Sequence, residues 1–268
     1  MSAVPLQPLR DFTTVTELAG TLVSAEAIDM VSTRYTFAAS RCEGRSVLEV
    51  ACGPGPGLGL LASRAARLVA GDYTRHLLER AAEHYGARVP LIQLDAARLP
   101  FASGVFDVVL LFEAIYFLPD VPAFLAECRR VLAPNGQVII VTANPEWDAF
   151  NPNESATRYW SARELQAVLE ASGFRAELLA AFPAAEVTLR GRVMKAVKRF
   201  AVRFHLVPHT MKGKELLKRV AFGKLDPFPA EVVAATGHYH APVPLMDRAA
   251  ADFKILYAIA HKTSRAVE

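Results

Sequence analysis

A glycine-rich segment near residue 50 is the first candidate for chemistry in this chain. Gly53, Gly55 and Gly57 stand in a short loop that follows the apolar run at 47–50. Residues without side chains let a ligand approach the main chain closely. The next apolar run ends nineteen residues after Gly53, at Asp72, whose carboxylate can accept hydrogen bonds from two donors. The pattern predicts a ligand held between a bare loop and an acid.

Three classes of ligand use loops of this kind. A Walker-type phosphate loop requires a lysine directly after its glycines, and none follows here. A dinucleotide fingerprint that begins at Gly53 fails at its sixth position, because Leu58 stands there. A shifted frame from Gly57 fits the letters but lies too far into the next helical pattern. A nicotinamide-dependent oxidoreductase therefore stays open as the weaker alternative.

The third class is S-adenosylmethionine, because the loop resembles motif I of class I SAM-dependent methyltransferases. That motif has an acid followed by alternating small residues, here Glu49, Ala51, Gly53 and Gly55, with Ala51 where the family usually has glycine. The likeness is closest to the small-molecule methyltransferases of the ubiquinone/menaquinone type. It implies S-adenosyl-L-methionine as cofactor, S-adenosyl-L-homocysteine as product, and no metal. A SAM-binding module without turnover is a further alternative.

Later segments continue the resemblance, in the family's order, over roughly residues 34–182. By resemblance, Asp72 accepts hydrogen bonds from the ribose hydroxyls, Asp95 binds the adenine amino group, and Glu113 ends the fourth strand beside the sulfonium. A helix before the glycine loop would place Tyr35 over the cofactor. The cofactor-binding residues expected in this way are Tyr35, Glu49, Ala51, Gly53, Gly55, Asp72, Tyr73, Asp95, Ala96, Phe112 and Glu113. The plainer alternative treats the acids as strand-end residues and the aromatics as core.

Methyl transfer from a sulfonium depends mainly on alignment, because the donor is already activated. Orientation of the reactants is worth about 7–11 kcal/mol, whereas a positioned base adds about 10²–10⁴-fold in rate. The acceptor is expected to be a small molecule, such as a natural product, a sugar or a quinone-like compound. Candidate catalytic residues are Glu113, His238 and His240, and candidate substrate contacts are Tyr116, Asn144 and Glu146.

The elements that position these residues follow from an alternation of short apolar runs with helical patterns between Ser46 and Asn144. Runs that are apolar throughout suit strands covered on both faces, and strand–helix repetition predicts a parallel sheet. We therefore expect an α/β fold, a Rossmann-like doubly wound sheet of about seven strands, with a helical cap inserted before the last. The expected divisions are an N-terminal helical lid (1–45), a SAM-binding core (46–182), an inserted basic cap (183–250), and the last strand and tail (251–268).

Charge is distributed unevenly along the chain. Eleven Lys or Arg residues and one acid lie between Arg190 and Lys224, although the whole chain has a net charge of only +3. This basic stretch predicts peripheral membrane contact, an anionic or lipid-like acceptor, or merely a solvated face. Nucleic acid is not favoured, because no known module of interleaved aromatic residues is present.

Three widely spaced cysteines, Cys42, Cys52 and Cys128, read as reduced thiols, and we expect a cytoplasmic protein. The longest apolar stretch, 105–118, is interrupted by Asp107 and Glu113, which argues against a transmembrane helix. The first residues do not have the pattern of a signal peptide. The oligomeric state is not predicted.

Overall fold

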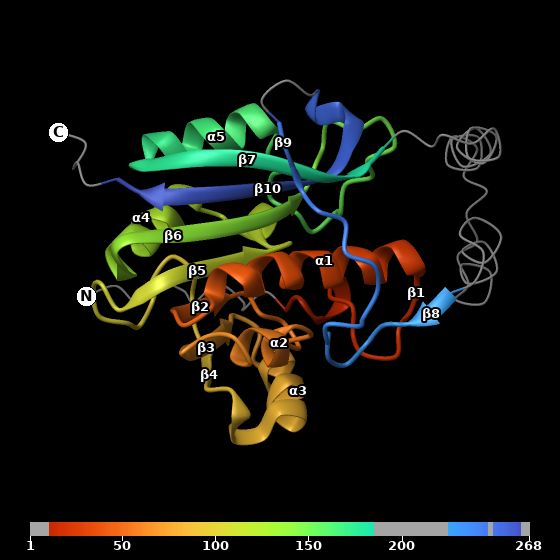
Figure 1. Ribbon diagram of the computed structural model, residues 1–268, viewed down its shortest axis with the longest axis horizontal. Helices are drawn as coiled ribbons and strands as arrows, with labels where there is room; N and C mark the ends of the chain where they lie inside the picture. The colour runs from red at the N-terminus through yellow and green to blue at the C-terminus, as the bar shows by residue number, and fades with distance from the viewer. Residues whose placement is uncertain (1–10, 185–224, 246–248, 264–268) are drawn as a thin grey trace, which may run out of the picture.

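A twisted eight-stranded sheet is the centre of the molecule (Figure 1). The computed structural model describes residues 11–184, 225–245 and 249–263. Along the sheet the strands follow the order β4-β3-β2-β5-β6-β10-β7-β9. Their bounds are β2 Ser46–Val50, β3 Arg67–Asp72, β4 Leu91–Gln93, β5 Phe106–Phe112, β6 Leu132–Ala143, β7 Phe174–Pro183, β9 Val243–Pro244 and β10 Phe253–Lys262.

Strands β4, β3, β2, β5 and β6 are parallel, and β10 runs antiparallel between β6 and β7. The parallel register places Val47 beside Val108, and Ile259 of β10 lies beside Ile139 of β6. Because β2, β3 and β5 are parallel, their carboxyl ends lie at the same end of the sheet. Chain order reverses between β2 and β5, so this end has the switch point of the sheet. The predicted doubly wound, mostly parallel sheet is confirmed, with the two-residue β9 as an additional edge strand.

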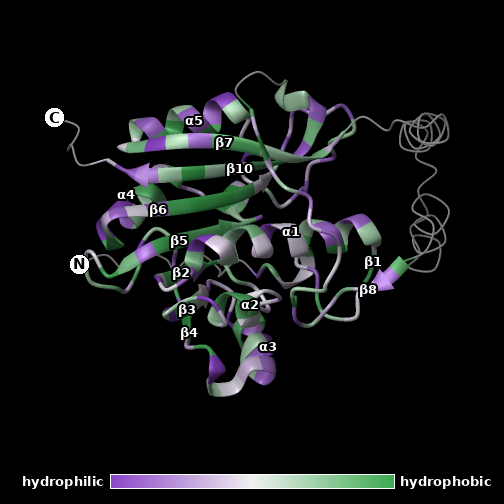
Figure 2. Ribbon diagram, viewed as in Figure 1, coloured by the Kyte–Doolittle hydropathy of each residue, from purple (hydrophilic) through white to green (hydrophobic). Residues whose placement is uncertain are grey.

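Helices cover both faces of the sheet, as the uninterrupted apolar strands predict (Figure 2). Along β5, Val108 and Leu110 pack with the first helical layer, whereas Val109 and Leu111 pack with the second. Buried side chains on both faces therefore hold the strand ends in place. The first layer consists of α1 (Ala25–Cys42), α2 (Leu58–Ala62) and α3 (Arg75–Tyr85), and the second of α4 (Val121–Val131) and α5 (Ala162–Ala171).

The helix ends follow local signals in the sequence. Helix α5 begins at Ser161 with a capping box, in which the side chain of Glu164 accepts from the Ser161 N–H while Ser161 accepts from Glu164. The helical pattern at 57–68 predicts a longer helix than α2, and this expectation is wrong. The Arg64 carbonyl instead accepts from the Gly44 N–H, and Ala66 N–H donates to the Arg45 carbonyl, so the chain turns into β3.

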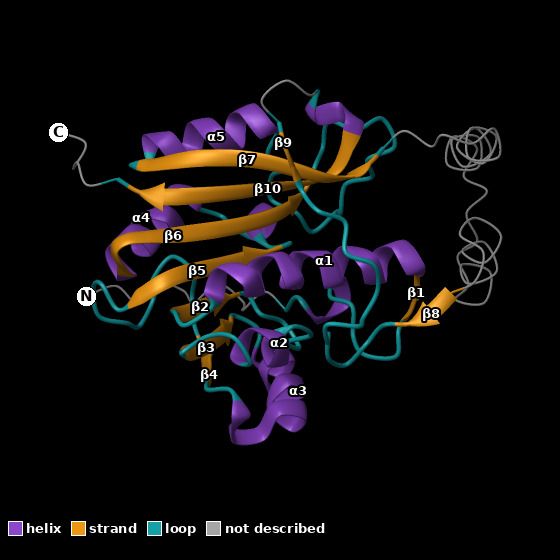
Figure 3. Ribbon diagram, in the orientation of Figure 1, coloured by secondary structure: helices purple, strands orange, loops and turns teal. Residues whose placement is uncertain are grey.

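The helical cap was expected in the segment between β7 and β10, but residues 185–224, with most of the basic stretch, lie outside the described residues, so the cap stays a prediction. Its described part pairs β8 (Leu225–Pro227) with β1 (Leu22–Ser24) in a second small sheet. A loop with bends and a turn follows β8 and crosses α1 (Figure 3). Within it, Val232 N–H donates to the Pro56 carbonyl of the glycine loop and His238 N–H donates to Asp29 of α1. None of the described helices combines the length and apolar character that crossing a membrane requires.

Candidate functional site

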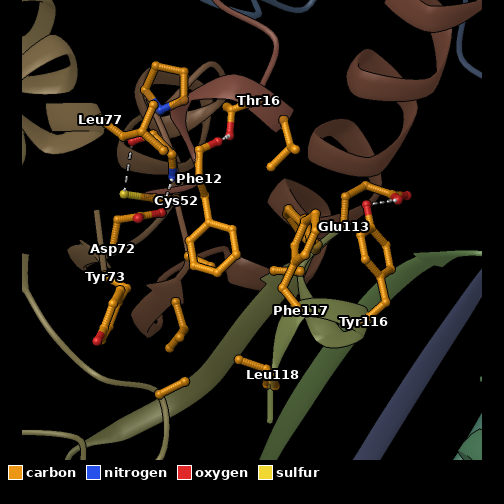
Figure 4. A pocket seen from close by; sticks show the side chains of 18 of the residues that line it. Phe12, Thr16, Cys52, Asp72, Tyr73, Leu77, Glu113, Tyr116, Phe117 and Leu118 are labelled. Carbon is orange, nitrogen blue, oxygen red and sulfur yellow. Dashed lines mark hydrogen bonds between the residues drawn. The ribbon is translucent and has the colours of Figure 1, made fainter. Parts of the chain in front are cut away.

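A cavity of about 430 Å³ opens where β2, β3 and β5 end, the edge at which open α/β sheets bind ligands. Figure 4 shows its wall, with Asp72 at the end of β3 and Tyr73 directly after it, Glu113 after β5, and Phe12 and Thr16 from the N-terminal segment. Among the expected cofactor residues, the wall contains Tyr35, Ala51, Gly53, Asp72, Tyr73, Asp95, Ala96, Phe112 and Glu113. The fold thus brings these nine expected residues together around one cavity from five separate stretches of sequence.

The loop after β2 has left-handed backbone at its small residues. Gly53 has φ 57°, which its lack of a side chain permits. Ala51 has the same φ of 57°, a conformation that is unfavourable for a residue with a Cβ. Gly55, also expected to contact the cofactor, lies behind the wall, where its carbonyl accepts from the Tyr85 hydroxyl at 2.6 Å.

The Asp72 carboxylate joins the end of β3 to this loop. Its Oδ2 accepts from the Gly53 N–H at 2.8 Å, and its Oδ1 accepts from the Thr74 N–H at 2.7 Å. Burial raises the pKa of Asp72, and these hydrogen bonds oppose the rise. Each oxygen keeps a second lone pair, so the carboxylate can still accept two hydroxyl donors from a ligand in the cavity.

Tyr35 on α1 forms another part of the wall and contacts the motif acid. Its hydroxyl donates to Glu49 Oε1 at 2.7 Å, while Glu49 itself lies beneath the wall with Oε2 buried and unpaired among the described residues. Burial raises the pKa of Glu49 to about 8, despite the opposing hydrogen bond from Tyr35. A Cβ on Gly57 would lie 2.0 Å from the Tyr35 ring, so glycine is required for this approach.

Glu113 stands at the end of β5 between two polar partners. Tyr116 donates to its Oε2 at 3.1 Å, drawn as a dashed line in Figure 4, and Arg34 Nη1 lies 3.6 Å from its Oε1. Burial raises the pKa of Glu113, and the Arg34 charge opposes that rise. The residue has φ 50°, and such strained backbone occurs often at functional sites. All three side chains line the cavity.

Asp95 and Ala96 line the cavity where the chain leaves β4. The Leu94 N–H donates to the Asp72 carbonyl, and Asp95 Oδ1 accepts from the Ala97 N–H at 2.9 Å. This turn places Asp95 on the same wall as Asp72 and Tyr73. A site that binds a ribose at Asp72 and a nucleobase at Asp95 would require this arrangement.

Two histidines expected as candidate bases lie away from the cavity wall. His238 and His240 are exposed, on the loop after β8 that crosses α1, and neither lines the cavity. His240 Nε2 lies 3.4 Å from Asp29 Oδ2, and its ring lies 4.7 Å from that of Phe182. The structure therefore does not bring these histidines together with Glu113.

Asn144 and Glu146, expected as substrate contacts, also lie outside the wall. Asn144 is fully buried and donates to the carbonyls of Ala250 and Phe253, both at 2.7 Å. Glu146 Oε2 accepts from the Ala162 N–H at 2.9 Å. Their polar atoms connect β6 to β10 and α5, which is a structural role.

Several wall residues were missed by sequence reasoning. Arg34 had a usable signal, since the positions three and four residues away on the same helix, 30, 31, 37 and 38, are all apolar. Phe228, by contrast, comes from a segment nearly 200 residues from α1, and no local pattern marks it. The missed lining residues include Phe12, Thr16, Glu17, Arg34, Phe117 and Phe228.

The charges around the cavity favour a cationic ligand. Among the described residues, four carboxylates line it against one guanidinium, that of Arg34, which suits a sulfonium group and opposes a pyrophosphate. The described residues contain no group of three or more His, Cys, Asp or Glu that could hold a metal ion. The wall fits S-adenosylmethionine, because Asp72 is held by main-chain hydrogen bonds and Gly53 has no side chain to block the ligand.

Comparison with known proteins agrees with this geometry. Residues 48–140 match a family described as a methyltransferase domain. A probable S-adenosylmethionine-dependent methyltransferase of Mycolicibacterium smegmatis is 38% identical over 152 residues, which is 53% of this chain and 57% of that protein. A fatty-acid O-methyltransferase of the same species is 35% identical over 116 residues, 42% of each chain. The chain spans about half the length of the curated relatives it matches.

Solved structures show the same fold. YcgJ of Bacillus subtilis superimposes with a TM-score of 0.55 at 16% identity, over 88% of this chain and all of that one. Residues 48–140 thus form a methyltransferase domain, and its motif order and strand order agree with the sequence resemblance to class I SAM-dependent methyltransferases. The matched domain and the relative named for S-adenosylmethionine support that compound as the cofactor.

Proposed function

We propose that the whole protein transfers a methyl group from S-adenosylmethionine to a small, largely apolar molecule. The observation that carries this proposal is the arrangement of Asp72, Asp95 and Glu113 around one cavity at the switch point of the sheet. Three acids at the ends of three strands match the ribose, adenine and sulfonium positions of one nucleoside. A cavity of this size falls within the usual range for small-molecule sites.

The residues of the chain have separate tasks in this proposal. S-adenosylmethionine supplies the activated methyl group when bound. Asp72 holds the ribose, while Tyr35 and Phe112, whose ring centroids lie 5.2 Å apart, keep water from one side of the cavity. Glu113, oriented by Tyr116, contacts the reacting groups and accepts a proton when the acceptor carries a hydroxyl.

Aromatic side chains line part of the cavity, and we expect the methyl acceptor to bind against them, which favours a lipid-like compound. Its aromatic residues include Phe12 and Phe117, whose ring centroids lie 5.1 Å apart, together with Phe228. The relative named for fatty acids supports the same class of acceptor. The proposal also includes the division into lid, core and cap, and membrane contact through residues 190–224. It further includes a cytoplasmic location, which the three free cysteines suggest.

The test combines binding with product detection. Calorimetry should show S-adenosylhomocysteine binding and no binding of NADH, and mass spectrometry should show a gain of one methyl group on a member of a fatty-acid, quinone and natural-product panel. A Glu113→Gln variant serves as the control for turnover. NADH binding would favour the oxidoreductase alternative, and SAM binding without any methylated product would favour a non-catalytic module.

A further inference from the structure

Arg34 has donors that the fold leaves unused. Its side chain is only 16% exposed, lies in the cavity wall, and forms an ion pair of 3.6 Å with Glu113 Oε1. It makes no hydrogen bond to any described residue. A guanidinium has five N–H donors in a planar fork, and burying them unpaired is costly. A ligand group that accepts from this fork would remove that cost.

The glycine loop has no spare donor for such a group. Cys52 N–H donates to the Gly71 carbonyl, Gly53 N–H to Asp72, and Gly55 N–H to the Cys52 carbonyl. Positions 54 and 56 are prolines, which have no N–H. Between residues 52 and 56 every main-chain donor is therefore absent or occupied. An anionic group in the cavity must find its partner elsewhere.

Arg34 is the one cationic side chain among the described residues that line the cavity. Glu17 and Glu113 both lower the cost of its charge, so its pKa is raised despite burial. A planar fork is the geometry that binds a carboxylate through two parallel hydrogen bonds. The other charged side chains that line it within the described part of the chain are acidic and repel an anion from the rest of this wall.

We propose that Arg34 binds a carboxylate of a ligand inside this cavity. Two sources offer that chemistry, the amino-acid end of S-adenosylmethionine and the head group of a carboxylic-acid acceptor; both rest on the proposed function. In either case Arg34 is a binding residue rather than only the partner of Glu113.

The experiment measures binding by calorimetry, without turnover. The probes are S-adenosylhomocysteine, 5′-methylthioadenosine, which lacks the amino-acid end, and decanoate added to protein loaded with S-adenosylhomocysteine. The variants are Arg34→Gln and Arg34→Lys. Arg41→Gln is the matched control, because Arg41 lies on the same helix and packs over the Phe37 ring, away from the cavity.

If the cofactor supplies the carboxylate, Arg34→Gln weakens S-adenosylhomocysteine binding by about 10- to 100-fold and leaves methylthioadenosine unchanged. If the acceptor supplies it, Arg34→Gln loses decanoate and keeps the nucleoside. Arg34→Lys should fall between, because it keeps the charge but loses the fork. Wild-type affinity for all three probes in Arg34→Gln would overturn the proposal.

Removing Arg34 alone leaves the buried Glu113 without its ion partner, and the fold could suffer. The double variant Arg34→Gln/Glu113→Gln removes both charges and keeps the test usable. Its reference is Glu113→Gln alone, so that only the Arg34 effect remains in the comparison. Failure of the wild type to bind S-adenosylhomocysteine contradicts the proposed function, whereas Arg34-dependent binding of decanoate to the unloaded protein would still support this inference.

Discussion

The Asp72 carboxylate accepts a hydrogen bond from the Gly53 N–H at 2.8 Å, across nineteen residues of sequence. This contact joins the end of β3 to the loop after β2, so the residue expected to hold the ribose also shapes the loop. Its second oxygen accepts from the Thr74 N–H, and both oxygens are held in fixed positions. Binding of a ligand and integrity of the loop should therefore depend on the same side chain.

Replacing Asp72 by Asn should weaken both properties. The amide group would present donors to an N–H of either Gly53 or Thr74, which leaves a buried polar group unsatisfied at a cost of about 1–3 kcal/mol. The affinity for S-adenosylhomocysteine should fall by about 10-fold or more, because one acceptor for the ribose hydroxyls is lost. Calorimetry and urea unfolding measure the two effects.

Asp107→Asn is a matched control for Asp72→Asn. Asp107 also accepts a main-chain hydrogen bond at 2.8 Å, from Ser46, but at the opposite ends of β2 and β5. It should change stability without changing cofactor affinity. Equal affinities of the two variants for S-adenosylhomocysteine would remove the role assigned to Asp72.

Ala51 offers a test of strain in the loop. Its φ of 57° lies in the left-handed region, where a Cβ costs about 1–2 kcal/mol. Ala51→Gly removes this cost but gives the unfolded chain more freedom, worth about 0.4–1 kcal/mol. We expect a net gain of about 0–1.6 kcal/mol in the free energy of unfolding, measured with urea.

The control for Ala51→Gly is Ala126→Gly, at an exposed position inside α4. There the same exchange should destabilise the protein by about 1 kcal/mol, because glycine is a poor helix former. The two substitutions should therefore have opposite signs. Destabilisation of similar size at both positions would show that Ala51 is not strained.

Much of the sheet and its cofactor edge could be predicted, because these features depend on local sequence. The apolar runs at 47–50 and 106–112 are buried on both faces, and a parallel sheet must bring their carboxyl ends together. Asp72 and Glu113 directly follow from this rule, since each stands at a strand end.

Asn144 and Glu146 show where the same rule fails. They follow β6 as Glu113 follows β5, yet β10 returns antiparallel beside β6 and offers its own carbonyls to Asn144. Whether a residue after a strand reaches the cavity thus depends on which strand lies beside it, and local sequence patterns do not predict that neighbour. Phe228 reaches the cavity for a similar reason, after a long insertion between β7 and β10.

Stability should depend on pH through Glu49. Its pKa is about 8 in the folded protein against an ordinary value of 4.5, so between these values the folded protein keeps a proton that the unfolded chain has released. The free energy of unfolding should therefore fall as pH rises through this window, by at most about 1.4 kcal/mol per pH unit. Glu49→Gln lacks this proton, so its stability relative to wild type should rise from pH 5 to pH 8.

Glu164→Gln is the control for that measurement. Hydrogen bonds from Ser161 and Arg158 lower the pKa of Glu164 to about 2, so the stability it contributes is present above its ordinary value and lost only in acid. Its difference from wild type should stay constant between pH 5 and pH 8. Parallel urea-stability profiles for wild type and Glu49→Gln would contradict a raised pKa at Glu49.

The contact between Gly57 and Tyr35 can be tested by a double-mutant cycle. Gly57 has φ −113°, an ordinary value, so Gly57→Ala adds no backbone strain and acts only by contact. The new Cβ would lie 2.0 Å from the Tyr35 ring, which must then move away from the cavity wall. Overpacking of this kind costs about 1–3 kcal/mol. Affinity for S-adenosylhomocysteine should fall as well, because Tyr35 lines the cavity.

Tyr35→Ala removes the ring that the new methyl group would meet. In that background Gly57→Ala should cost little, and the two substitutions should be non-additive by at least about 1 kcal/mol. Urea unfolding of the four proteins gives the coupling energy, and calorimetry shows whether affinity follows it. Additive effects would mean that the α1 helix can shift to accept the methyl group, and that glycine at position 57 is not required by the Tyr35 ring.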